Sequence, residues 1–356
     1  MALRFAFVFA MVVSALLGQV PTSKIPGLQR VATSWMERTH IPALSISVQS
    51  GGQPDYAAAW GFSDLENSVP ATPRTVFRLA SLSKPFTAVA ALKLVEAGKL
   101  DLDAEIQRYL PSFPRKQWPI TTRQLLSHLS GIRAYEGDEI NITRHYGDLM
   151  DGLEIFAKDP LLYEPGTKYH YSTYGFNLAG AVVQAIAGVP FATFVEQQVL
   201  QPSATLTMRP DSVFDLIPNR TRGYYLRADG QIQNCGLADT SYKLPGGGWV
   251  AAAPDITQFA RTLMDEKLLN RETLNVMWSS NRLKDGSSND YGLGWNNERR
   301  QGLRVAWHGG GQQGTSTFLI VCPERKISIV VLANLEGAPV REIAIDLFDE
   351  IAGLSK

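Results

Sequence analysis

The sequence predicts an α+β fold in which both ends of the chain form an antiparallel sheet flanked by helices, with an inserted, mostly helical domain. Two observations lead to this prediction. Strand-like apolar runs occur near the start of the chain, at 43–49 and 56–61, and again near its end, at 318–322 and 327–333. The segment between these two pairs is rich in helical periodicity. One sheet interrupted by a helical insertion is the simplest arrangement that joins such blocks.

The first block of the chain begins with a helix and continues with two strands. Leu28, Val31, Ala32, Trp35 and Met36 follow helical spacing and predict a helix at 28–39. The strands at 43–49 and 56–61 are separated by a Gly- and Pro-containing turn at 50–54. Together these elements define the first part of a sheet subdomain, at 28–77.

The second block, at 78–247, forms the predicted helical subdomain. Its clearest helix is expected at 81–97, because Pro85 suits a helix start and Gly98 suits a helix end. Apolar periodicity predicts two more helical stretches at 120–129 and 175–187. The stretch from Gly131 to Gly166 is rich in Gly, Asp and aromatic residues, which indicates a loop wall over a site rather than a core.

The third block, at 248–356, completes the sheet subdomain. The strands at 318–322 and 327–333 flank the turn Pro-Glu-Arg-Lys, which predicts a hairpin. An amphipathic pattern at 340–351 predicts a closing helix. The whole catalytic unit is therefore placed at 28–356. We expect an active site at the interface between its sheet and helical parts, because pockets favour such interfaces.

The first twenty residues are typical of a secretory signal peptide. Arg4 precedes an apolar run at 5–17, which is shorter than the roughly 20 residues of a spanning helix. Cleavage after Ala15 and cleavage after Gly18 both fit the pattern. We therefore expect residues 1–20 to be removed, a periplasmic or secreted mature chain, and no stable membrane span after cleavage. An N-terminal anchor or a buried core helix is the alternative.

Composition and charge exclude several classes of protein. The chain has 356 residues, 45% of them hydrophobic and 19% charged, which is an ordinary globular balance. Its 34 Lys and Arg balance its 34 Asp and Glu, and they form no basic block. Because binding to phosphate needs clustered Lys and Arg, we expect no nucleic-acid partner. Two cysteines cannot make a disulfide framework, and free or buried thiols at Cys235 and Cys322 are favoured over a disulfide.

Several common catalytic patterns are absent from the sequence. It contains no Gly-x-Ser-x-Gly motif, which excludes the usual α/β-hydrolase site. The five histidines never fall four residues apart, so no zinc helix is expected, and we predict neither a metal nor a cofactor. The run at 309–314 matches the dinucleotide pattern Gly-x-Gly-x-x-Gly, but a strand-like run follows it where that motif requires a helix.

One pattern does carry chemistry, the Ser-x-x-Lys at Ser81–Lys84. At a helix start the two side chains lie on one face, about 5–6 Å apart. A serine hydroxyl needs a base within hydrogen-bond reach, and a lysine whose pKa is lowered by burial can serve. On its own the motif is better explained as a helix cap followed by a surface lysine. Its neighbourhood favours catalysis.

The neighbourhood consists of motifs that follow one another along the whole chain. They are the segments 75–88, 100–103, 125–132, 165–167 with 171–173, 246–249, 291–295 and 308–310. In these segments and in their order, from about residue 28 to the C-terminus, the sequence resembles the serine β-lactamase-like proteins of the class C type. This family includes D-alanyl-D-alanine carboxypeptidases, D-aminopeptidases and esterases with a β-lactamase fold.

The resemblance implies roles for three side chains. Ser81 would be the acylated nucleophile, Lys84 would assist its deprotonation, and Tyr171 would be the second base or acid. A tyrosine beside ammonium groups has a lowered pKa, so we expect a phenolate that can accept the Ser81 proton. Whether Lys84 or Tyr171 accepts it first is left open. Tyr171 also fits a plain aromatic core residue, since Tyr169 and Tyr174 stand beside it.

The resemblance also implies the residues that bind the substrate. The oxyanion hole would combine the N–H of Ser81 with that of Gly311, and His308, Gly309 and Gly310 occupy the third catalytic motif. Two departures from the family pattern concern substrate choice. Thr173 stands where the family usually has Asn, and Gly309 stands where it often has a hydroxyl residue. His308 is mostly neutral at pH 7, since the reference pKa of histidine is about 6.5, so recognition of a carboxylate is expected to be weak.

These residues lead to one expected function with two alternatives. We expect a secreted serine hydrolase that works through an acyl-Ser81 intermediate on small esters or D-amino-acid amides. The first alternative is a D-alanyl-D-alanine carboxypeptidase or class C-like β-lactamase. The second is a non-catalytic penicillin-binding or scaffold relative. The expected partner is a small ester, a D-amino-acid peptide or a β-lactam.

Overall fold

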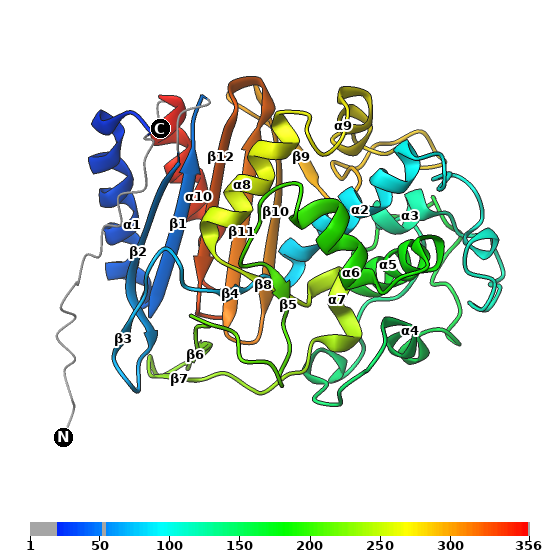
Figure 1. The fold of residues 1–356 in the computed structure, drawn as a ribbon, viewed down its shortest axis with the longest axis horizontal. Coiled ribbons are helices and arrows are strands. Elements are labelled where there is room, and N and C mark those ends of the chain that lie inside the picture. Colours follow the sequence, from blue (N-terminus) through cyan, green and yellow to red (C-terminus); the bar gives the residue numbers. More distant parts are fainter. Residues whose placement is uncertain (1–19, 52–54, 355–356) are drawn as a thin grey trace.

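The structure is a computed structural model that describes residues 20–51 and 55–354, so residues 1–19 of the predicted signal peptide lie outside it. The described residues form a seven-stranded antiparallel sheet with helices on both faces and a group of helices beside it (Figure 1). This arrangement confirms the predicted α+β fold.

Both ends of the chain build the middle of the large sheet, as predicted. The first strand pairs antiparallel with the last, and Leu44 lies opposite Ala333. In spatial order the strands are β3 (Val69–Pro70), β2 (Tyr56–Asp64), β1 (Ala43–Gln49), β12 (Ile327–Ala333), β11 (Thr315–Cys322), β10 (Leu303–Gln312) and β9 (Asn296–Arg300). Two small sheets contain β4 (Phe77–Arg78), β8 (Trp249–Ala251) and β5 (Arg209–Pro210), and β6 (Tyr224–Leu226) with β7 (Ile232–Asn234).

Helices cover both faces of the large sheet (Figure 1). The helices on these faces are α1 (Ile25–Thr39) and α10 (Val340–Ala352) on one side and α8 (Ala253–Met264) on the other. Side chains alternate along a strand, so Ile329 and Val331 join the core under α1 and α10, whereas Val330 and Leu332 join the core on the opposite face. Burial on both faces explains why β11 from Phe318 onward and most of β12 are apolar.

The remaining helices pack beside the sheet. They are α2 (Lys84–Glu96), α3 (Thr122–Leu126), α4 (Leu149–Gly152), α5 (Thr173–Ala187), α6 (Phe191–Val195), α7 (Leu244–Gly247) and α9 (Arg271–Met277). The helix α2 packs against α5 and is buried over most of its length, which fits its many alanines. Dividing the chain into sheet and helical subdomains at residues 78 and 247 stays a prediction. Among the described residues no single helix is long and apolar enough to cross a membrane. The helix α5 and the segment 191–200 meet the length and hydropathy criteria only when taken together, and they are bent by 79° relative to each other.

Two of the predicted helices are shorter than expected. The helix expected at 81–97 begins as a 3-10 turn at Ala80–Ser83, and α2 starts only at Lys84. The stretch expected to be helical at 120–129 forms only α3. Thr121 starts α3 with a capping box, and the left-handed backbone of His128 (φ 60°) follows its end.

The stretch between Gly131 and Gly166 is only partly the loop wall that we expected. Much of it is irregular, and it contains α4 and two short 3-10 turns. However, Leu149, Leu153 and Phe156 are buried in the core beside α5. The expectation of a wall rather than a core is therefore wrong for these side chains, because their apolar spacing is too short and irregular to be recognised as a helix.

Candidate active site

The proposed nucleophile lies on the 3-10 turn Ala80–Ser83, between the sheet and the helical part. The Leu79 N–H donates to the Trp249 carbonyl over 2.8 Å, and the Leu79 carbonyl accepts from the Thr317 hydroxyl over 2.8 Å. Ala80 has a left-handed backbone (φ 49°) that turns the chain from β4 toward α2. Strands on both sides therefore fix the turn, and Ser81 stays partly exposed at its tip.

The Lys84 side chain is completely buried and points at Ser81. Its Nζ lies 3.0 Å from the Ser81 Oγ, 2.7 Å from the Gly246 carbonyl and 3.4 Å from the Thr173 Oγ1. Burial, together with the charge of Lys243, lowers the pKa of Lys84 well below its usual value. A lowered pKa favours the neutral form of the amine, which can accept a proton.

Tyr171 lies beside these two residues, immediately before α5. The Lys84 Nζ is 4.8 Å from the centre of the Tyr171 ring, and the Ser81 side chain is close enough to the Tyr171 hydroxyl to influence its pKa. Tyr171 is 36% exposed as a whole residue, but desolvation of its hydroxyl raises its pKa, and the nearby Ser81 only partly opposes this. The expected lowering of the Tyr171 pKa is therefore wrong. The causes of this shift include no ammonium group that would stabilise a phenolate.

His308 on β10 is buried and neutral. Its Nδ1 lies 2.6 Å from the Gly309 carbonyl, so Nδ1 carries the proton and donates it. Its Nε2 accepts from the Tyr291 hydroxyl over 3.0 Å. Burial, with a contribution from Lys84, lowers the pKa of His308 to about 3. The expectation of a neutral His308 at pH 7 is confirmed, and both ring nitrogens are engaged by the protein.

The glycines after His308 bring β10 against the nucleophile turn. A Cβ on Gly310 would clash with the Leu79 carbonyl and lie 3.0 Å from the Leu82 nitrogen, so only glycine permits this approach. A Cβ on Gly311 would meet open space. Gly311 therefore lies on the strand that adjoins Ser81, which is consistent with its predicted place in an oxyanion hole.

Thr173 is the first residue of α5 and contacts Lys84. Its hydroxyl lies 3.4 Å from the Lys84 Nζ, and Thr173 also neighbours the partly buried Tyr135. The residue is only 6% exposed. At this position the shorter hydroxyl side chain serves the protein's own lysine, whereas the family's Asn was expected to contact substrate.

The chain can also be compared with known protein families. The sequence model of the family described as Beta-lactamase matches residues 28–352. This chain belongs to the beta-lactamase family.

Several known proteins resemble the chain over most of its length. The serine beta-lactamase-like protein LACTB, mitochondrial, of Homo sapiens is 27% identical over 414 residues, which cover 86% of this chain and 76% of that protein. EstCE1, a hydrolase with promiscuous acyltransferase activity, is 25% identical with a TM-score of 0.77, covering 92% and 98% of the two chains. The D-amino acid amidase of Ochrobactrum anthropi SV3 has the same fold, with 21% identity, a TM-score of 0.81 and coverage of 93% and 99%.

Sequence reasoning missed Lys243 in this beta-lactamase-family site. It is 2% exposed, and its Nζ lies 5.6 Å from the centre of the Tyr135 ring and 5.4 Å from that of Tyr242. Burial and the charge of Arg78 lower the pKa of Lys243 to about 8, although Asp211 opposes them. The available signal was its position, three residues before the glycine run of the 246–249 motif.

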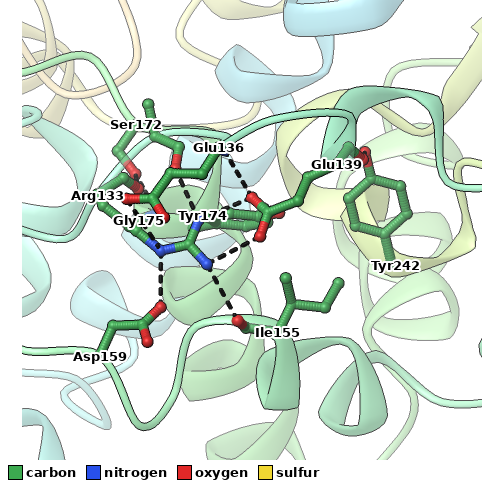
Figure 2. A network of polar contacts seen from close by, with 10 residues as sticks. Arg133, Glu136, Glu139, Ile155, Asp159, Ser172, Tyr174, Gly175 and Tyr242 are labelled. Carbon is green, nitrogen blue, oxygen red and sulfur yellow. Dashed lines mark hydrogen bonds and ion pairs between the residues drawn. The ribbon is translucent and has the colours of Figure 1, made fainter.

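An ion network around Arg133 holds the start of α5 at Ser172 (Figure 2). The Arg133 guanidinium binds Glu139 through both terminal nitrogens, at 2.7 and 2.9 Å, and Asp159 through Nε at 2.6 Å. The Arg133 carbonyl accepts from the Ser172 hydroxyl over 2.6 Å, and the same hydroxyl caps α5 by accepting from the Gly175 N–H. The network therefore anchors the chain directly after Tyr171.

The described residues contain no group of three or more His, Cys, Asp or Glu placed to hold a metal ion. Cys235 and Cys322 are both free thiols, as expected, and Cys322 is buried. Neither residue takes part in the arrangement around Ser81.

Proposed function

We propose that this chain is a serine hydrolase that works through an acyl-Ser81 intermediate, with small esters or D-amino-acid amides as substrates. The observation that carries the proposal is the 3.0 Å contact between the Ser81 Oγ and the completely buried Lys84 Nζ. A neutral amine at this distance can accept the serine proton as the hydroxyl attacks a carbonyl. The beta-lactamase family and the likeness to the hydrolase EstCE1 support the same reaction class.

The pKa shifts favour Lys84 over Tyr171 as the first proton acceptor. In acylation, the Ser81 Oγ bonds the substrate carbonyl carbon while its proton moves to the Lys84 Nζ. The carbonyl oxygen becomes an oxyanion, which the N–H groups of Ser81 and Gly311 are proposed to bind. Lys84 becomes an ammonium only at this stage.

Tyr171 begins the cycle as a neutral phenol, because its pKa is raised. When the bond to the leaving group breaks, the Tyr171 hydroxyl gives its proton to the leaving alcohol or amine, and the Lys84 ammonium restores that proton. In deacylation, water attacks the acyl carbon and gives a proton to neutral Lys84. The lysine then returns the proton to the Ser81 oxygen as the acid product leaves.

The third motif favours substrates without a carboxylate next to the scissile bond. The His308 ring is neutral, and both of its nitrogens bond the protein. Gly309 supplies no hydroxyl that could assist it. A β-lactam or a peptide ending in D-alanine carries such a carboxylate, so we propose that both are poor substrates.

The test is a panel of substrates with matched enzyme variants. The wild type and Ser81→Ala are incubated with p-nitrophenyl acetate, a D-amino-acid p-nitroanilide, nitrocefin and a D-Ala-D-Ala peptide, and intact mass reports the acyl-enzyme. We expect Ser81-dependent turnover of the ester or the D-amide and little turnover of the other two compounds. Comparable turnover of nitrocefin, or steady release of D-alanine, would reject the substrate preference and favour a β-lactamase or carboxypeptidase.

A fluorophosphonate probe separates an enzyme from a non-catalytic relative. We expect one stoichiometric adduct on the wild type and none on Ser81→Ala. An unmodified wild type would reject the hydrolase proposal and favour a binding or scaffold protein.

We further propose that the mature chain acts in the periplasm or is secreted. The proposal rests on the apolar run at 5–17 after Arg4. N-terminal sequencing of the protein expressed with its own leader is expected to show cleavage after Ala15 or Gly18. An intact N-terminus in the cytoplasmic fraction would reject it.

A further inference from the structure

His128 contacts the chain on both sides of Tyr171. Its carbonyl accepts a hydrogen bond from the His170 N–H over 3.0 Å, and its ring Nδ1 lies 3.1 Å from the Ser172 nitrogen. Its ring lies against Tyr171 itself, with 4.2 Å between the two ring centres. One residue therefore binds the neighbours of Tyr171 and packs on its side chain.

These contacts fix the protonation of the His128 ring. The Ser172 N–H can only donate, so Nδ1 must accept and the ring proton must be on Nε2. Burial and the charge of Lys84, with smaller effects from His308 and His170, lower the pKa of His128 well below its usual value. In a protonated ring, Nδ1–H and the Ser172 N–H would both be donors, and no hydrogen bond could form between them. The ring is therefore neutral whenever the contact to Ser172 exists.

The other ring nitrogen of His128 has no hydrogen-bond partner in the described part of the chain. The residue is 1% exposed, and aromatic rings surround it, with centre-to-centre distances of 4.7 Å to Tyr291 and 5.1 Å to Phe176. A buried donor without an acceptor costs free energy, and an apolar residue would avoid that cost. The left-handed backbone at this position (φ 60°) is a second unfavourable feature for a residue other than glycine.

We propose that His128 is a positioning residue that holds the Tyr171 hydroxyl at Ser81. The Nδ1 contact and the ring contact together set both the backbone and the ring of Tyr171, and the network around Arg133 fixes the chain beyond it. A displacement of about 1 Å in a reacting group can cost about 10²-fold in rate, so a side chain that sets this position affects turnover without touching the substrate. This inference rests on the role proposed above for Tyr171.

Variants of His128 separate its two contacts. His128→Asn places an amide oxygen close to the position of Nδ1, and asparagine tolerates the left-handed backbone. His128→Gln carries the same amide one bond further out, away from the Ser172 N–H. His128→Phe keeps an aromatic ring and removes the acceptor. His40→Asn is the matched control, because His40 also has a positive φ (56°) and ends α1, far from the site in sequence.

With p-nitrophenyl acetate, we expect His128→Phe to lose about 10²-fold in kcat with little change in KM. We expect His128→Asn to stay within about tenfold of the wild type, which is the range of one lost or weakened hydrogen bond. His40→Asn should match the wild type. If His128→Phe does not fold, as judged by thermal unfolding, His128→Gln replaces it as the variant without an acceptor.

A double-mutant cycle with Tyr171→Phe decides whether His128 acts through Tyr171. In the Tyr171→Phe background, the change at position 128 is expected to alter kcat by no more than about twofold, because the group it positions is gone. An equal loss in both backgrounds, or wild-type kcat in His128→Phe, would overturn the inference and leave the proposed function intact. Full activity of Tyr171→Phe alone would overturn the role of Tyr171 and this inference with it, while Ser81 labelling would still test the hydrolase.

Discussion

The Lys84 Nζ lies 3.0 Å from the Ser81 Oγ and 2.7 Å from the Gly246 carbonyl. None of the hydrogen bonds that Lys84 makes within the described residues goes to a carboxylate. An ammonium that is buried without a carboxylate loses its proton readily, because burial penalises the charged form. The two residues thus pair a hydroxyl with a neutral amine, which is the requirement for general-base activation of serine.

Replacing Lys84 by Met removes this base. We expect kcat/KM for p-nitrophenyl acetate to fall by about 10²–10⁴-fold, the usual contribution of a general base. Lys84→Arg should fall similarly, because a guanidinium stays protonated. Lys93→Met is the control, since Lys93 also lies on α2 and donates to a carbonyl, that of Leu268, over 3.0 Å. Steady-state kinetics measure kcat/KM for both variants. Equal kcat/KM values for Lys84→Met and Lys93→Met would contradict the assignment of Lys84 as the base.

Lys243 should affect the pH dependence of the reaction. Activity requires neutral Lys84, so kcat/KM is expected to fall as the pH drops through the pKa of Lys84. The charge of Lys243 contributes to lowering that pKa. Lys243→Met should therefore raise the pKa of Lys84 and move the acid limb of the kcat/KM profile to higher pH. Lys243→Arg keeps the positive charge, so its acid limb should stay at the wild-type pH. If the acid limb of Lys243→Met also stays there, the charge of Lys243 does not influence the pKa of Lys84.

Lys243 should also lower the stability of the fold at neutral pH. Its pKa is about 8 in the folded chain against an ordinary value of 10.5, so the unfolded chain binds more protons between these pH values and stability rises with pH there. The lowered pKa corresponds to a cost of about 3 kcal/mol below that window. Lys243→Met should therefore be more stable than the wild type at neutral pH, and the gain should shrink as the pH rises past about 8. Urea unfolding at two pH values measures this, and a gain that does not depend on pH would exclude the cause.

The elements that sequence could predict are those with a local signal. The segments 318–322 and 327–333 are apolar over most of their length, and the Ser-x-x-Lys motif at Ser81 is continuous in the chain, so both could be recognised. The state of Tyr171 could not, because desolvation by segments that are distant in the sequence raises its pKa. Lys243 was missed for the same reason. Nothing beside it in the sequence shows that it is 2% exposed.

Arg133 is expected to be important for stability. Its side chain is 8% exposed and binds both Glu139 and Asp159. Arg133→Met leaves Glu139 without its guanidinium, and we expect a loss of about 2–3 kcal/mol, somewhat below the 3–5 kcal/mol for fully buried pairs because Glu139 keeps some contact with solvent. Arg123→Met breaks the exposed pair with Asp103 and should cost no more than about 1 kcal/mol. Chemical unfolding in the same buffer measures the free energy of unfolding of both variants. Equal losses in the two variants would show that the Arg133 ion pairs contribute no more than an exposed pair does.

Gly310 and Gly311 provide a matched pair that tests how closely β10 must approach the nucleophile. Both residues pair with β11, and neither has a positive φ, so alanine strains the backbone at neither position. The two positions differ only in what a new Cβ meets. At Gly310 it meets the Leu79 carbonyl and the Leu82 nitrogen, which belong to or adjoin the turn that carries Ser81, whereas at Gly311 it meets open space.

Gly310→Ala should therefore push β10 and the turn apart. If the N–H of Gly311 belongs to the oxyanion hole, that displacement weakens the binding of the oxyanion, and we expect kcat to fall by about 10²-fold or more. Gly311→Ala keeps its own N–H in place and should retain most of the activity. Fluorophosphonate labelling rates and p-nitrophenyl acetate kinetics on both variants measure the difference. If Gly311→Ala loses more activity than Gly310→Ala, the distance between β10 and the turn is not critical. Such a result would instead show that substrate occupies the space beside Gly311.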